Sequence, residues 1–87
     1  MMGCPTITLT GVTRAVYDCL LQRARSLGLP VPTETGGSIA YADSQADFAW
    51  NEGAATLSIT ITRKPGWIRC EMVESQLRQA ARACGGE

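Results

Sequence analysis

Cysteine is the most reactive residue type in this sequence, and it occurs at positions 4, 19, 70 and 84. Cys70 lies near the start of an expected helix and next to Arg69. A helix N-terminus and a nearby cation both favour the reactive thiolate form, so this position suggests a thiol-dependent enzyme or a redox sensor. The alternative interpretation is that Cys70 is a small core residue, because it falls on the apolar stripe of that helix and free cysteine is often buried as a hydrophobe.

The chain contains no histidine, so the imidazole that usually activates a nucleophilic cysteine is lacking. No two cysteines form the Cys-x-x-Cys pair typical of structural zinc sites. We therefore expect no metal and no cofactor, and our leading hypothesis is a non-enzymatic accessory domain. The N-terminal residues lack the basic start and apolar run of a secretory signal. We accordingly expect a cytoplasmic protein with reduced thiols.

A second group of functional side chains lies in the segment 63–69, which reads Arg-Lys-Pro-Gly-Trp-Ile-Arg. Three cations, Arg63, Lys64 and Arg69, flank Trp67 in a predicted loop. Arginine and tryptophan are the residue types that most often anchor interfaces. The segment therefore predicts a surface that binds a protein partner or a second copy of the chain. The alternative is that Trp67 folds back over the end of the core while the cations remain solvated.

Two further sets of polar residues have simpler interpretations. Hydroxyl side chains alternate along two predicted strands: Thr6, Thr8 and Thr10, and Thr56, Ser58, Thr60 and Thr62. On neighbouring strands they would form a flat array that suits an ordered surface or a second copy, although threonine is also common on the wet face of a sheet. The carboxylates Asp43, Asp47 and Glu52 lack the spacing of a calcium loop, and we expect turn and solubility roles for them.

These residues must be positioned by a small fold, because the chain has only 87 residues and predicts a single domain over 1–87. Its 45% hydrophobic and 18% charged residues are typical of a globular protein. The formal net charge of zero disfavours nucleic-acid binding, which needs a basic surface. No apolar stretch approaches the roughly 20 residues of a spanning helix, so we expect no membrane association.

Hydrophobic periodicity predicts the elements. Strict alternation predicts strands over 6–10, 38–42, 46–51 and 55–62, the middle two joined as a hairpin. Apolar stripes at helical spacing predict helices over 13–27 and 68–84, with Thr13 as N-cap and with Gly28 and the pair Gly85-Gly86 ending them. The predicted fold is α+β: a single antiparallel sheet of about four strands with two helices on one face, in the order β-α-β-β-β-α.

This architecture leaves a third functional hypothesis, a small apolar ligand held between the helices and the sheet. We rank it below the interaction domain and the thiol enzyme, because a ligand pocket typically needs roughly 300 Å³ or more. An 87-residue chain has few side chains to spare for the walls of such a pocket.

Residues 47–81 resemble a kind of small bacterial α+β domain of unknown function. The resemblance depends on a strand, Leu57-x-Ile59-x-Ile61, that leads through Lys64-Pro65 into a final amphipathic helix. The element order is also similar to that of small proteins associated with polyhydroxyalkanoate granules. The resemblance implies the fold and a bacterial origin, and it implies no catalytic residues, since function does not follow from architecture.

Overall fold

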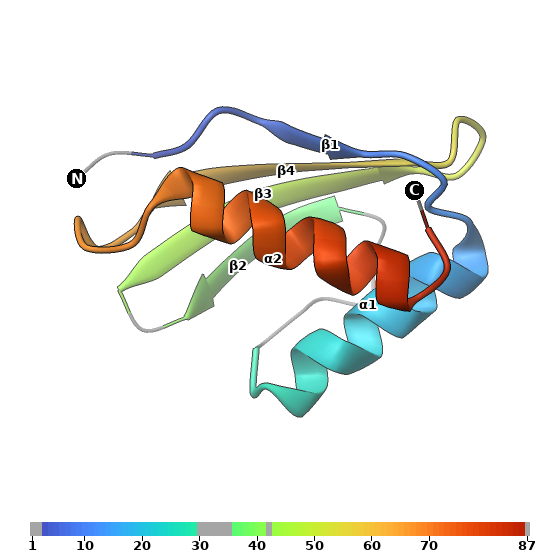
Figure 1. Ribbon diagram of the computed structural model, residues 1–87, viewed down its shortest axis with the longest axis horizontal. Coiled ribbons are helices and arrows are strands. Elements are labelled where there is room, and N and C mark those ends of the chain that lie inside the picture. The colour runs from blue at the N-terminus through green and yellow to red at the C-terminus, as the bar shows by residue number, and fades with distance from the viewer. Residues whose placement is uncertain (1–2, 30–35, 42, 87) are drawn as a thin grey trace.

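A computed structural model describes residues 3–29, 36–41 and 43–86. It confirms the α+β fold and the predicted order of elements (Figure 1). The elements are β1 (Ile7–Leu9), α1 (Arg14–Ser26), β2 (Gly36–Tyr41), β3 (Ser44–Asn51), β4 (Thr56–Arg63) and α2 (Cys70–Ala83).

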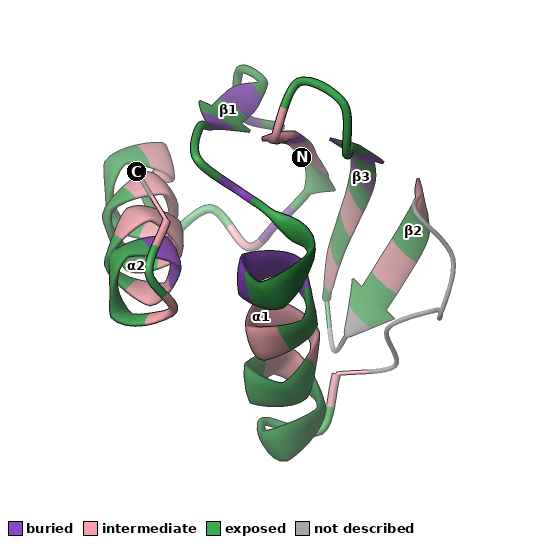
Figure 2. Cartoon of the chain, turned by 90° about the vertical axis from the view of Figure 1, so that its right-hand side faces the viewer, coloured by how far each residue is buried: buried purple, intermediate pink, exposed green. Residues whose placement is uncertain are grey.

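The four strands form one antiparallel sheet in the order β1-β4-β3-β2. Alternation along β3 buries Phe48 and Trp50 on one face and exposes Asp47 and Ala49 on the other. Both helices lie on the apolar face, as predicted (Figure 2). The opposite face of the sheet has no helix in the described part of the chain.

The strand boundaries differ from the prediction at the first hairpin. Ser44 and Gln45, predicted as turn residues, belong to β3 and pair with Tyr41 and Ala40. The other end of β2 lies at Gly36, two residues before the predicted start of this strand at residue 38. Glycine suits this position because a Cβ there would lie only 3.1 Å from the carbonyl oxygen of Phe48.

The helix ends follow the sequence signals. Thr13 occupies the N-cap of α1, although its side chain makes no capping hydrogen bond. Gly28 and Gly85 have φ angles of +85° and +97°, which places them in the left-handed region that ends a helix. Neither helix in the described residues combines the length and the apolar composition needed to cross a membrane.

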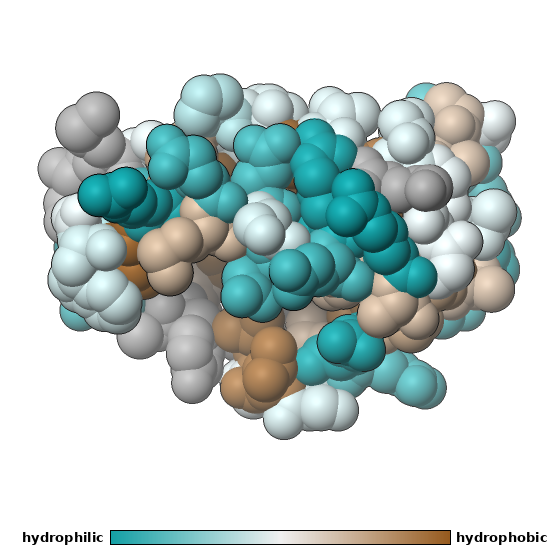
Figure 3. Space-filling view, in the orientation of Figure 1, coloured by the Kyte–Doolittle hydropathy of each residue, from teal (hydrophilic) through white to brown (hydrophobic). Residues whose placement is uncertain are grey.

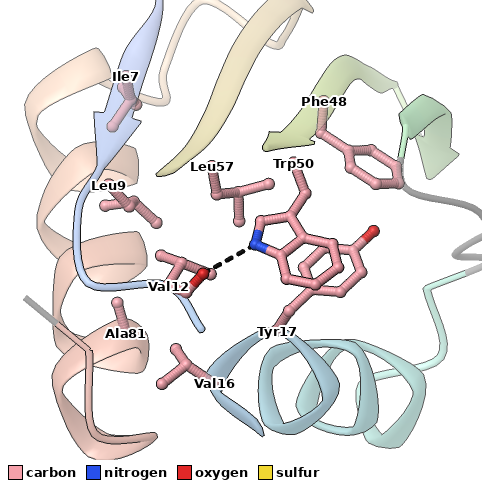
Figure 4. Packing of buried hydrophobic residues seen from close by; sticks show 9 residues of the cluster. All are labelled: Ile7, Leu9, Val12, Val16, Tyr17, Phe48, Trp50, Leu57 and Ala81. Carbon is pink, nitrogen blue, oxygen red and sulfur yellow. Dashed lines mark hydrogen bonds between the residues drawn. The ribbon is translucent and has the colours of Figure 1, made fainter. Parts of the chain in front are cut away.

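The best-packed part of the core lies where α1 begins and α2 ends. Leu9 and Val12 are completely buried there. The rings of Tyr17 and Trp50 stack with centroids 4.3 Å apart and an interplanar angle of 7°. The indole Nε1 of Trp50 donates a hydrogen bond to the carbonyl oxygen of Val12 at 2.8 Å, so the one polar atom of this ring is satisfied (Figure 4).

The expectation of reduced thiols is wrong for this structure, because all four cysteines form disulfides. Cys4 bonds to Cys70 and Cys19 bonds to Cys84, with Cα–Cα distances of 5.6 and 5.7 Å, which is within the usual range. The apolar stripes of α1 and α2 face each other, so Cys19 and Cys84 meet between the helices. The two bonds attach α2 to the rest of the fold at both of its ends.

Candidate functional site

A cavity of about 620 Å³ lies between the two helices and the sheet. The sheet and both helices contribute to its walls. The principal apolar residues are Leu20, Leu21 and Ala24 of α1; Phe48, Ile59 and Ile61 of the sheet; and Val73, Leu77 and Ala80 of α2.

Small side chains explain why this space is not filled. Ala24, Ala46, Ala80 and Ala83 line the cavity from α1, β3 and α2. Each is a position where a leucine-sized side chain would reach into the gap between the layers. The two disulfides hold α2 in place at its ends, so the position of this helix does not depend on side chains that fill the space beneath it.

The burial of the lining residues shows that the cavity is open to solvent. Ile59, Val73 and Leu77 are only partly buried, whereas Leu9 and Leu57, which line its deep end, are buried. Leu27, at the end of α1, lines the outer part and is 72% exposed. Figure 3 shows hydrophilic side chains over α2 and a group of apolar atoms at the lower edge, over the C-terminal end of α1.

Few polar side chains line this cavity among the described residues. They are Arg23 on α1, Ser44 and Gln45 on β3, and Gln76 and Gln79 on α2. None of the described lining residues is a carboxylate. The phenol of Tyr17 also lies in the wall, and its burial, reinforced by the nearby charge of Asp18, raises the pKa of this group above its ordinary value.

The position of Trp67 contradicts the interpretation that this side chain folds back over the end of the core. Trp67 is 80% exposed, so it does not cover the end of the core. Lys64 is the buried residue instead, at 9% exposure, and its Nζ donates to the carbonyl oxygen of Ile68. The aliphatic stem of Lys64 thus packs inward while its ammonium group closes the loop, and Arg63 and Arg69 are left exposed with Trp67.

Cys70 does not provide a free thiol in this structure, since it is bonded to Cys4. A thiol-dependent reaction at Cys70 needs the reduced form. The observed disulfide therefore gives the thiol hypothesis no support, and it makes Cys70 part of the scaffold that holds the first turn of α2.

The hydroxyl residues do lie on neighbouring strands. Thr8 pairs with Ser58 across β1 and β4, and the hydroxyls of Thr6 and Thr60 are 2.8 Å apart. They lie on the face of the sheet away from the helices. The ordinary interpretation as the wet face of a sheet suits this arrangement, because no described side chain covers it.

The predicted carboxylates make local contacts. Asp47 accepts a hydrogen bond from Ser38 on β2. Glu52 pairs with Arg14 at 3.1 Å, which raises the pKa of that guanidinium, and Arg14 also lies 5.3 Å from the centre of the Trp50 ring. Among the described residues, no three side chains of the usual ligand types group together to hold a metal ion.

The cavity belongs to the hypothesis that ranked third from the sequence, a small apolar ligand between the helices and the sheet. The sequence feature that could have predicted the cavity is the presence of alanines at several inward positions of the predicted helices and strands, such as Ala24, Ala46 and Ala80. That signal is weak by itself, because alanine is also the best helix former. Only the separation between the helices and the sheet in the folded chain shows that these alanines border a cavity.

Comparisons of the chain with protein-family models, with curated proteins and with solved structures gave no match. The resemblance of residues 47–81 to small bacterial domains therefore stays a prediction. Function must be inferred from the geometry of the cavity and of the Trp67 loop.

Proposed function

We propose that this protein binds a small apolar ligand in the cavity between its helices and its sheet. The observation that supports the proposal is the space of about 620 Å³ with predominantly apolar walls. That volume falls within the range of about 300 to 1,000 Å³ that small-molecule pockets occupy. The few polar groups at its margin also fit the general pattern of such sites.

The apolar walls of the cavity favour the binding of an apolar ligand. Apolar walls that face a void lose dispersion contacts, and those that face water remain hydrated. A ligand that covers Ile59, Val73 and Leu77 removes their exposed area from water, at about 25 cal/mol per Å². Water that enters from the solvent finds few polar partners along these walls, so a ligand can displace it at low cost.

A neutral, environment-sensitive dye tests the proposal. N-phenyl-1-naphthylamine should bind the purified protein with one saturable site and a rise in fluorescence. Ala46→Phe places a large ring in the cavity and should abolish this binding. Ala49→Phe is the matched control, because Ala49 lies on the same strand but is exposed on the opposite face.

Circular dichroism and urea unfolding must show that both variants remain folded. Unchanged dye binding by a folded Ala46→Phe variant would contradict the proposal. So would the absence of saturable binding to the wild-type protein.

A second candidate function is the interaction domain expected from the sequence, which binds an unknown protein partner or a second copy of the chain. The observation that favours it is the 80% exposure of Trp67 beside two exposed arginines, Arg63 and Arg69. An exposed tryptophan costs solvation free energy in the isolated chain, and interfaces use this residue type as an anchor.

Native mass spectrometry and quantitative partner capture test this second candidate. Trp67→Ala together with Arg63→Glu should remove the dimer or the captured partner without changing the unfolding midpoint. Met72→Ala is the matched control, since Met72 is also an exposed apolar residue, at 56%, but lies on α2 outside the loop. Equal loss in both variants would argue against a contact centred on Trp67.

The disulfides also bear on the compartment. We infer an oxidising environment rather than the cytoplasm expected from the sequence, because stable disulfides are rare in reducing compartments. Alkylation of acid-quenched cells, followed by mass spectrometry of the protein, should find no free thiol. Four alkylated cysteines would favour the cytoplasm instead.

A further inference from the structure

We infer that the ligand is an amphiphilic monoanion, a long-chain monocarboxylate, whose chain occupies the cavity and whose carboxylate pairs with Arg23 at the mouth. This inference rests on the proposed function and adds the chemical class of the ligand. It depends on the distribution of polar and charged groups around an otherwise apolar space.

Charge complementarity supports an anionic head group. Arg23 is the only charged residue among the described lining residues. It is exposed on α1, one turn before Leu27, and it makes no ion pair within the described part of the chain. A ligand with a positive head group would find no carboxylate among the described residues that line this mouth.

The remaining polar groups of the lining agree with this head group. Gln76 and Gln79 on α2 and Gln45 on β3 present amide groups that can donate hydrogen bonds. A single guanidinium matches one carboxylate, which it can hold through two parallel hydrogen bonds. A dianionic phosphate would leave part of its charge unpaired at this site.

The lining also restricts the apolar part of the ligand. Most of the described lining residues are aliphatic, among them Leu20, Ile59 and Val73, and they come from both helices and the sheet. Such walls suit a flexible alkyl chain that makes contacts on all sides. The two aromatic residues of the described lining, Tyr17 and Phe48, belong to the buried core cluster.

Competition against N-phenyl-1-naphthylamine provides the test. Saturated fatty acids of 10 to 16 carbons are compared with the alcohols of the same chain length, below their micellar concentrations. Each additional pair of methylenes should tighten binding by about tenfold until the cavity is full. The acid should bind about fivefold more tightly than the alcohol, which is the scale of an exposed ion pair.

Arg23→Gln should remove the preference for the acid, measured as the ratio of the acid and alcohol affinities within this variant. Arg25→Gln is the matched control, because Arg25 is exposed on the same helix but does not line the cavity. It should retain the fivefold preference. Urea unfolding verifies that both variants are folded.

The outcomes separate this inference from the function on which it rests. If acids and alcohols displace the dye equally well from the wild-type protein, the anionic head group is wrong and the apolar site remains. Equal loss of the preference in Arg23→Gln and Arg25→Gln overturns the position of the head group. Failure of the dye and of every amphiphile to bind overturns the proposed function itself.

Discussion

The two ends of the helix–sheet interface contain similar apolar residues but differ in how closely these residues pack. At the packed end, Leu9, Val12 and Trp50 are buried and the indole of Trp50 stacks on Tyr17. At the hollow end, around Ile61, side chains of the same kind border a cavity of about 620 Å³ and are only partly buried. The contrast indicates that one end supplies the stability of the fold and the other end is available for binding.

The disulfides make this division feasible in so short a chain. Cys19–Cys84 connects the helices near the packed end, and Cys4–Cys70 attaches the start of α2 near the hollow end. Small domains usually lack enough buried surface to tolerate a cavity without such covalent support. We therefore expect the stability of this protein to depend on covalent bonds where a larger domain would use side-chain packing.

Loss of a disulfide should have the largest effect. Each bond links residues 65 or 66 positions apart, so each double serine variant should lose about 4 kcal/mol of unfolding free energy. The variants should differ in binding: Cys4→Ser/Cys70→Ser should weaken dye binding more, since it frees the start of α2. Urea unfolding and dye titration measure the two effects. If Cys19→Ser/Cys84→Ser weakens dye binding equally, the binding site is not confined to the hollow end.

The same truncation at the two ends should have unequal effects. Leu9→Ala removes a completely buried side chain and should lower the unfolding free energy by about 3 kcal/mol. Leu77→Ala removes a partly buried side chain beside an existing space and should lower it by about 1 kcal/mol. Urea unfolding compares the two variants directly. Equal losses would show that the hollow end is as well packed in solution as the other end.

Filling the cavity should have a smaller and opposite effect. Ala80→Leu adds aliphatic volume to the cavity and should raise the unfolding free energy by about 1 kcal/mol, while dye affinity falls. Ala15→Leu makes the same change at an exposed position of α1 and is the matched control. A gain in stability that leaves dye affinity unchanged would place the binding site elsewhere.

The smallest expected effect is a pH dependence at the packed end. The pKa of Tyr17 in the folded state is raised above its ordinary value near 10, so the neutral phenol is favoured by folding. Its contribution to stability should therefore be complete below about pH 10 and be lost as the pH rises through the folded pKa. Urea unfolding between pH 8 and 11 measures this loss, which Tyr17→Phe should reduce. If the unfolding free energy of Tyr17→Phe depends on pH as that of the wild-type protein does, the loss does not come from Tyr17.

The sequence predicted the fold well because its elements carry local signals. The alternation of Leu57, Ile59 and Ile61 and the apolar stripes of the helices depend only on neighbouring residues, and the structure confirms the elements that they predict. The disulfides were missed because pairing Cys19 with Cys84 requires the relative placement of two helices. Nothing local to either cysteine contains that information.

The candidate site was harder to predict for a related reason. The segment around Trp67 was identified from residue types alone, but the burial of Lys64 could not be anticipated, since it depends on the path of the loop. The cavity is defined by absent volume next to residues such as Ala46 and Ala80. An alanine that borders a space and an alanine that fits against a neighbour look the same in a sequence.

The order of the two disulfides along the chain has a consequence for how this protein is made. The bonds interleave, since Cys19 lies between Cys4 and Cys70, and Cys84 lies beyond both. During synthesis Cys4 and Cys19, the first two cysteines of the chain, emerge before the others. A bond between them would close a much shorter loop than either native pair. Oxidation before the C-terminal helix has emerged thus favours a wrong bond that must later be exchanged. Production in good yield should therefore depend on a thiol–disulfide isomerase or on delayed oxidation.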